Sequence, residues 1–180
     1  SHEPYIIPEK YKDKFPKGNI PMHQCVGYTD YALQMFFRQA KKEDWFDNTI
    51  FLFTADHSNQ SDYAEYEKPI NRFANSFMIY APNGNFQGVN EQLSQHIDIY
   101  PTIVDLIGYE KPFRSWGQSL ISPAVQKPYV VDFFGNNYFI MDDQYIVISD
   151  GENVLGMYKE DDRGLKNNLK EQSLPAMQLL

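Results

Sequence analysis

The sequence predicts an α/β fold followed by a small antiparallel subdomain. Apolar residues recur at helical spacing from Thr29 to about Glu43. A nearly all-apolar run, Thr49 to Ala55, comes next and is typical of a parallel strand buried on both faces. Beyond residue 122 the pattern changes to short strands separated by turn residues. We therefore expect an α/β domain over residues 1–122 and an antiparallel subdomain over residues 123–180.

The composition is that of a folded, acidic protein. A chain of 180 residues with 42% hydrophobic and 16% aromatic residues can bury one sizeable core. The net charge of −8 argues against a nucleic-acid partner, because phosphate binding needs a basic face. The single cysteine, Cys25, excludes an intramolecular disulfide and a cysteine-rich metal site. No apolar run reaches the ~20 residues that cross a bilayer as a helix.

The first part of the chain is expected to lead from a loop through a helix into a strand. The segment from Glu9 to Gln24 carries lysines, prolines and glycines, which indicates a surface loop. The helix that follows has Thr29 and Asp30 in its first turn, and it leads into the strand that ends at Asp56. A helix that leads into a buried strand is half of a βαβ unit, so a parallel strand is expected before it.

A second strand and a second helix are expected after a polar loop over residues 58–71. The strand covers residues 73–81 and stops at the turn residues Pro82 to Asn85. The helix opens in the segment 94–102 with Asp98 as its N-cap, and Gly108 is its C-terminal stop.

The last third of the chain has the pattern of an antiparallel meander. We expect strands over residues 129–134, 138–141, 145–149 and 154–158, joined by hairpin turns rich in Gly, Asn and Asp. The acidic run Glu160 to Asp162 is expected to be a solvated turn. A closing helix is expected from about Leu165.

A candidate metal site lies where the first strand ends, at Asp56 and His57. In open α/β sheets, ligands bind beyond the carboxyl ends of the strands. Carboxylate and neutral imidazole are usual ligands of Zn²⁺ and also suit Mn²⁺. The alternative is that Asp56 caps a turn and His57 is a solvated loop residue.

Other polar residues are weaker candidates for binding an anionic substrate. Lys68 and Arg72 lie in the loop after Asp56 and His57 and could hold an anionic group. His96 precedes the second helix and could face the site. The alternative for all three is a solvated or packed side chain. His23, in the N-terminal loop, is interpreted as a residue without a functional role.

Five short motifs occur in order along almost the whole chain. They are Ser1-His2-Glu3-Pro4-Tyr5, Tyr28 to Leu33, Asp56-His57 after an apolar strand, Gln95 to Gly108, and Leu155 to Asp162 with Asn168-Leu169. Together they resemble the sulfatase-like branch of the alkaline phosphatase superfamily, and within it the lipoteichoic acid synthase group of bacterial phosphoglycerol transferases. Ser-His-Glu-Pro-Tyr is similar to that group's Ser-His-x-Pro-Phe. The resemblance implies the C-terminal half of an alkaline-phosphatase-like three-layer sandwich, completed by the antiparallel subdomain.

The resemblance also implies roles for three residues. Asp56 and His57 match two metal ligands of the family, for which Mn²⁺ is favoured and Mg²⁺, Zn²⁺ and Ca²⁺ are alternatives. His2 matches the histidine that contacts the transferred phosphoryl or sulfuryl group. The metal would polarise a non-bridging oxygen of the substrate and lower the pKa of a nucleophilic hydroxyl.

The family's nucleophile and an acidic metal ligand belong to the upstream half of the fold and cannot be assigned in this sequence. The nucleophile is a Thr in the transferases and a modified Cys or Ser in true sulfatases. Cys25 lacks the Cys-x-Pro/Ala-x-Arg pattern of that modified residue and is interpreted as a structural thiol. Asp-His-Ser replaces the Asp-His-Gly of many relatives, which disfavours an ordinary sulfatase. We therefore expect half of a longer protein, with an incomplete metal site and little activity in isolation.

Three functions remain open from the sequence. The first is metal-dependent transfer or hydrolysis of phosphoryl esters, with phosphoglycerol or a phospholipid head group as the substrate. The second is hydrolysis of sulfate esters on glycans, and the third is a non-catalytic binding domain. The resemblance further implies an extracytoplasmic bacterial protein, in the periplasm or on the outer face of the cell membrane. Its membrane anchor and its N-terminal half, the expected partner of this chain, would lie outside the sequence.

Overall fold

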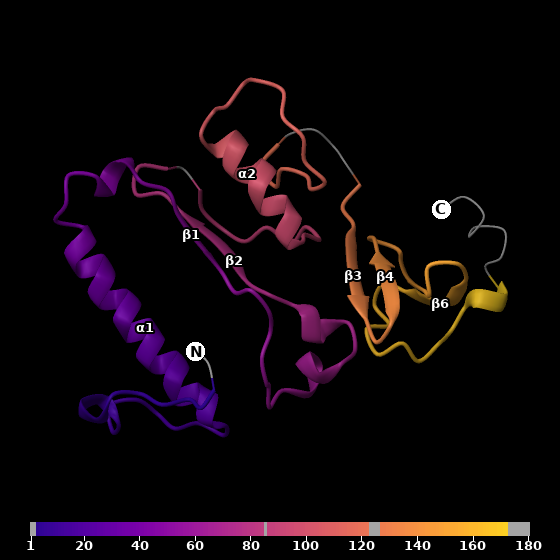
Figure 1. Cartoon of the computed structure of the whole chain (residues 1–180), viewed down its shortest axis with the longest axis horizontal. Coiled ribbons are helices and arrows are strands. Elements are labelled where there is room, and N and C mark those ends of the chain that lie inside the picture. The colour runs from indigo at the N-terminus through magenta and orange to yellow at the C-terminus, as the bar shows by residue number, and fades with distance from the viewer. Residues whose placement is uncertain (1–2, 85, 123–126, 173–180) are drawn as a thin grey trace. The chain divides into compact units, whose positions relative to one another are not determined.

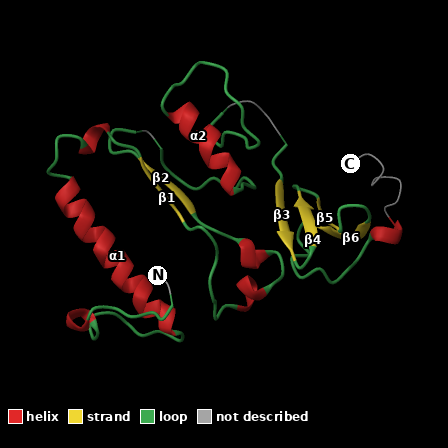
Figure 2. Ribbon diagram, in the orientation of Figure 1, coloured by secondary structure: helices red, strands yellow, loops and turns green. Residues whose placement is uncertain are grey.

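The protein consists of helices and antiparallel strands, described here in a computed structural model over residues 3–84, 86–122 and 127–172. It divides into two compact units, Ser1–Gly88 and Val89–Leu180. Figure 1 follows the elements along the chain, and Figure 2 separates helices from strands. The predicted domain boundary at residue 122 falls within the second unit and stays a prediction. In the part of the chain that the structure describes, no helix is long and apolar enough to cross a membrane.

The long helix α1 runs over Pro21–Ala40 and begins eight positions before the predicted start at Thr29. The prediction of a loop as far as Gln24 was therefore wrong. Pro21 occupies the first turn, where its fixed φ suits a helix and its missing N–H costs nothing. Gly27 lies inside the helix, where Phe15 packs closely against it. A Cβ at position 27 would lie 3.1 Å from the Phe15 side chain, so the absence of a side chain there makes room for Phe15. Tyr11 packs beside Phe15 against the same helix, with its ring centroid 5.3 Å from that of Tyr28.

The first sheet pairs β1, Phe51–Thr54, with β2, Phe77–Tyr80. The pairing is antiparallel, and Phe51 lies opposite Tyr80. The expectation of a parallel strand buried on both faces was wrong, because β1 is half-buried and its partner among the described residues is β2. An apolar run indicates that a strand is buried. It does not indicate whether the strand beside it runs parallel or antiparallel, because tertiary packing decides that direction. The rings of Phe37, Phe46, Phe51 and Tyr80 contact one another and form the core between α1 and this sheet.

In the second unit, a 3₁₀ helix over His96–Asp98 leads into α2, Ile99–Leu106. Asp98 stands at the predicted N-cap position of α2, but its backbone is helical and its side chain makes no hydrogen bond that caps α2. Its carboxylate instead accepts the Gln95 N–H, in a capping box that begins the 3₁₀ helix with Gln95 as the N-cap. The end of α2 was predicted correctly: Gly108 has φ +68°, and Tyr109 N–H donates to the Val104 carbonyl over 3.1 Å, which forms a Schellman motif.

The predicted meander is confirmed. Its strands follow one another in one antiparallel sheet: β3 Val130–Phe134, β4 Asn137–Met141, β5 Tyr145–Ser149 and β6 Val154–Lys159. Gly135 and Asn136 both have positive φ, as a type I′ hairpin turn requires. Phe139, Met141, Ile146 and Met157 are the buried side chains of this sheet.

The predicted closing helix from Leu165 is absent from residues 165–169, and a single 3₁₀ turn over Lys170–Gln172 ends the described chain. Asp162 explains the difference, because its carboxylate accepts the N–H groups of Lys166 and Asn167. These bonds give the backbone an alternative to helical pairing. The turn from Glu160 to Asp162 therefore also holds the chain that follows it. Glu160 forms an ion pair with Arg163 in the same turn.

Candidate functional site

Asp56 and His57 lie side by side immediately after β1. Their side chains are 89% and 72% exposed, and His57 Nε2 lies 3.6 Å from Asp56 Oδ2. The other carboxylate oxygen, Oδ1, accepts the His57 backbone N–H over 3.0 Å. That bond directs Oδ2 towards the imidazole, so one nitrogen and one oxygen face the same region of space.

The imidazole of His57 is held in the tautomer that a metal ligand needs. Its Nδ1 lies 2.7 Å from the Ser58 carbonyl oxygen. A carbonyl oxygen only accepts, so Nδ1 carries the hydrogen and Nε2 of the neutral ring presents its lone pair. Metal-ligating histidines typically donate their second N–H to a carbonyl or a carboxylate. Two ligands at ~2.1 Å in a tetrahedral site are about 3.4 Å apart, close to the observed Nε2–Oδ2 separation. This pair fits a divalent cation.

Asp56 and His57 alone do not make a complete metal site. Over the residues that the structure describes, no group of three or more His, Cys, Asp or Glu side chains could hold a metal ion. A structural Zn²⁺ site takes four protein ligands and a catalytic one takes three. The remaining ligands would have to come from elsewhere.

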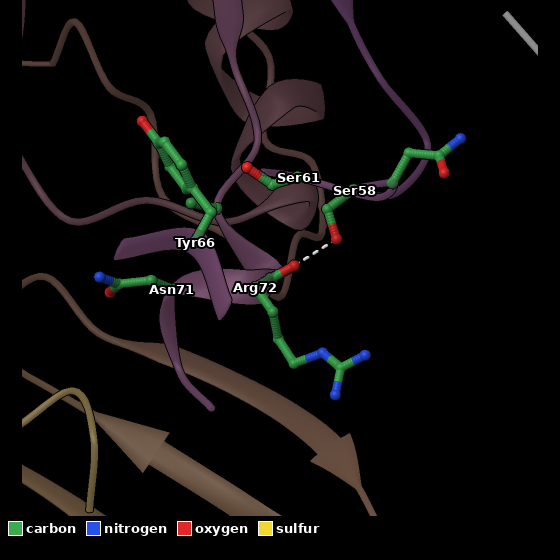
Figure 3. A pocket seen from close by; sticks show the side chains of 7 residues that line it. Ser58, Ser61, Tyr66, Asn71 and Arg72 are labelled. Carbon is green, nitrogen blue, oxygen red and sulfur yellow. Dashed lines mark hydrogen bonds between the residues drawn. The ribbon is translucent and has the colours of Figure 1, made fainter. Parts of the chain in front are cut away.

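The segment after His57 contains no helix or strand as far as residue 63 and is held by side chains. The Ser58 hydroxyl donates to the Arg72 carbonyl oxygen, the bond drawn in Figure 3. Asn75 Nδ2 donates to the Ala55 carbonyl oxygen over 3.3 Å. These bonds connect both sides of the Asp56-His57 pair to the chain that enters β2.

A half-open pocket of about 180 Å³ lies beside Ser58 (Figure 3). Hydroxyl, amide and guanidinium side chains line most of it: Ser58, Asn59, Ser61, Tyr66, Asn71 and Arg72, together with Ala74. Arg72 is one of these lining residues, and its role in binding an anion stays a prediction. Lys68 does not line this pocket, and its ammonium pairs with Glu65 over 2.6 Å.

The N-terminal motif reaches the same loop through Tyr5, whose hydroxyl donates to Asn59 Oδ1 over 3.1 Å. The predicted catalytic residue His2 lies outside the described residues. His96 lies in the second unit, in the 3₁₀ helix before α2. Cys25 is buried in α1 as a free thiol, which agrees with its interpretation as structural.

Sequence reasoning missed a contact between His23 and the loop after His57. His23 lies in the first turn of α1, not in a loop, and its Nε2 is 3.5 Å from Asp62 Oδ1. Nothing in the sequence signals this contact, because the two residues are far apart and neither belongs to a recognisable motif.

Comparison with known proteins identifies the family. The family model described as Sulfatase matches residues 1–109. The chain belongs to the sulfatase family. Its similarity extends to lipoteichoic acid synthase from Staphylococcus aureus strains USA300 and NCTC 8325. Each is 26% identical over 166 residues, covering 81% of this chain and 25% of the relative.

A solved structure supports the same placement. It is a protein in the alkaline phosphatase superfamily from Vibrio parahaemolyticus, with a TM-score of 0.70 and 25% sequence identity. The match covers 98% of this chain and 47% of the Vibrio chain. The predicted sulfatase-like membership and fold class are thereby confirmed. The chain spans about a quarter of the length of the curated relatives that it matches.

Proposed function

We propose that this chain supplies two metal ligands to a sulfatase-family enzyme that transfers or hydrolyses phosphoglycerol-type phosphoryl esters. The geometry of one pair carries the proposal: His57 Nε2 and Asp56 Oδ2 lie 3.6 Å apart, and the imidazole is in the ligating tautomer. Sequence similarity to lipoteichoic acid synthases supports the phosphoryl reaction over other reactions of the family.

Each residue has a distinct role in this proposal. Asp56 and His57 hold the cation, for which Mn²⁺ is favoured, with Mg²⁺, Zn²⁺ and Ca²⁺ as alternatives. A bound cation would polarise a non-bridging oxygen of the ester and favour ionisation of the attacking hydroxyl. His2 is assigned to the transferred group, where a hydrogen-bond donor stabilises developing charge. The nucleophile and the remaining ligands belong to the upstream half of the catalytic domain.

Arg72 is the better of the two proposed anion-binding side chains. It lines the pocket next to Ser58, and a guanidinium can bind phosphate through two parallel N–H donors. Lys68 is not one of the residues that line this pocket, and its ammonium lies 2.6 Å from Glu65. His96 stays a weaker proposal, as a residue that contacts substrate when the catalytic domain is complete.

Sulfate-ester hydrolysis on glycans is the second candidate, and the family description Sulfatase favours it. Asp-His-Ser in place of Asp-His-Gly favours phosphoryl chemistry. The upstream nucleophile separates the two: an unmodified Thr supports phosphoryl transfer, and a modified Cys or Ser supports sulfate hydrolysis. For either reaction we propose an extracytoplasmic location, with the membrane anchor in the part of the protein outside this sequence.

The metal assignment can be tested by NMR, since paramagnetic Mn²⁺ broadens the signals of nearby amides even when it binds weakly. We expect broadening centred on residues 55–58 of the 180-residue chain, and its loss in Asp56→Asn. Asp44→Asn is the matched control, because it removes one exposed carboxylate of the same unit. Broadening that survives Asp56→Asn, or that is equally lost in Asp44→Asn, would overturn the assignment.

A further inference from the structure

Three polar side chains connect the loop after His57 to the start of α1. Asn19 Nδ2 donates to Asp62 Oδ2 over 2.5 Å, and His23 Nε2 lies 3.5 Å from Asp62 Oδ1. Both carboxylate oxygens of Asp62 thus face a partner from the segment that opens the helix. The side chains of His23 and Asp62 are 31% and 20% exposed, far less than those of Asp56 and His57.

One hydrogen bond to the His23 ring fixes which of its nitrogens faces Asp62. The backbone N–H of Asn19 donates to His23 Nδ1 over 3.1 Å. Since Nδ1 accepts, Nε2 of the neutral ring carries the hydrogen, and this nitrogen lies within 3.5 Å of Asp62 Oδ1. Asn19 therefore fixes the imidazole through its backbone and binds the same carboxylate through its side chain.

The backbone beside His23 is shaped to admit the imidazole. Gly18 has φ +63°, a conformation that strongly favours glycine. A Cβ at this position would lie 2.2 Å from His23 Nδ1. A larger residue could not approach the ring so closely, so the His23–Asp62 contact depends on this glycine.

We propose that His23 and Asp62 are positioning residues for the metal ligands. The segment 57–62 has no helix or strand of its own, so its place is set by side-chain contacts: Ser58 with Arg72, Asn59 with Tyr5, and Asp62 with His23 and Asn19. The Ser58 carbonyl oxygen accepts the Nδ1–H of His57. Movement of this segment would displace that carbonyl and rotate the imidazole away from Asp56 Oδ2. This inference rests on the proposed metal function.

The test compares four single variants with the unsubstituted chain by two measurements. One is the heteronuclear NOE of amides 57–62 in metal-free protein, and the other is Mn²⁺ affinity. His23→Ala should lower both the heteronuclear NOE and the Mn²⁺ affinity. The affinity should fall about three- to tenfold, which is less than when a residue that directly hydrogen-bonds a metal ligand is replaced. His23→Gln should restore most of the loss, because an amide can accept from Asn19 and donate to Asp62. Asp62→Asn should weaken both, and Asp44→Asn should change neither.

The variants separate positioning from simple charge attraction. His23→Ala leaves the negative charge of Asp62 in place, so a purely electrostatic role predicts a loss in Asp62→Asn alone. That pattern would overturn the proposal, as would unchanged amide order in His23→Ala. If the unsubstituted chain shows no broadening around Asp56, the metal assignment fails, and amide order then decides the positioning role alone. If His23→Ala does not fold, failure of Asp62→Asn to loosen residues 57–62 also overturns it.

Discussion

The hydroxyl of Tyr5 donates a hydrogen bond to Asn59 Oδ1 over 3.1 Å, across 54 positions of the sequence. Tyr5 ends the Ser-His-Glu-Pro-Tyr motif, and Asn59 lies two positions after His57. The bond therefore places the end of that motif beside the loop that carries the candidate metal ligands. Asn59 in turn accepts the Gln60 N–H over 2.7 Å, so one amide oxygen joins the two segments and shapes the loop.

Replacing Tyr5 with Phe should loosen this loop while leaving α1 intact. The change removes one hydroxyl, and the net value of a hydrogen bond is about 0.5–1.5 kcal/mol. Because the tyrosine is only half-buried, we expect a loss of unfolding free energy near the low end of this range, measured in urea. Tyr63→Phe is the matched control, since Tyr63 belongs to the same loop and is mostly exposed. Equal effects of both substitutions would contradict the role of the Tyr5 hydroxyl.

Asp98 should be the most sensitive carboxylate of the second unit to substitution. The residue is 4% exposed, and its carboxylate accepts the N–H groups of Gln95 over 2.9 Å and Gln118 over 2.8 Å. Asparagine offers only one acceptor oxygen, so Asp98→Asn leaves one N–H facing a donor. The expected loss of unfolding free energy is about 1–3 kcal/mol.

The control for Asp98 is Asp105→Asn, which changes an exposed carboxylate on α2. It should alter stability by less than about 0.5 kcal/mol. A similar loss in both variants would show that negative charge on α2 matters, and that the two N–H bonds of Asp98 do not. Urea unfolding at neutral pH measures both.

Elements of the fold that depend on neighbouring residues in the sequence were predicted, and those that depend on tertiary packing were not. The meander follows from local turn chemistry, such as the positive φ of Gly135 and Asn136, and it was predicted almost to the residue. The start of α1 was missed because Gly27 weakens the helical pattern, and only the packing of Phe15 explains a glycine there. The direction of β2 beside β1 was missed because it depends on tertiary packing.

The same distinction holds for the candidate site: its candidate ligands were predicted from the sequence, and its supporting contacts were not. Asp56 and His57 were recognised as candidate ligands because an apolar run that ends in two ligand-type residues is a local pattern. The contacts of Tyr5 with Asn59 and of Asn19 with Asp62 span 54 and 43 positions, and polar residues in loops give no sign of their partners. Supporting contacts of a site therefore need coordinates, even where its candidate ligands do not.

Stability of the second unit should fall at acid pH partly through Asp162. Hydrogen bonds from the backbone N–H groups of Asn167 and Lys166 hold the pKa of this carboxyl below its ordinary value. A lowered pKa stabilises the fold fully above the unfolded pKa of about 3.9, and this stabilisation is lost as pH falls through the folded pKa. We expect the carboxyl ¹³C signal of Asp162 to titrate below that value. Asp162→Asn should flatten the acid limb of unfolding free energy, and an unchanged limb would contradict the assignment.

Gly18→Ala should destabilise the first unit by more than its backbone conformation alone explains. Gly18 and Gly108 have nearly equal positive φ, +63° and +68°, so alanine pays a similar backbone cost of about 1–2 kcal/mol at either position. Only at Gly18 would the new methyl group lie 2.2 Å from His23 Nδ1, whereas nothing lies within 4 Å at Gly108. The larger loss of unfolding free energy in Gly18→Ala should therefore come from displacement of the imidazole. Adding His23→Ala to Gly18→Ala should remove this excess, because the methyl group then has room. An excess that persists in the double variant would place its origin in the backbone and not in the His23 contact.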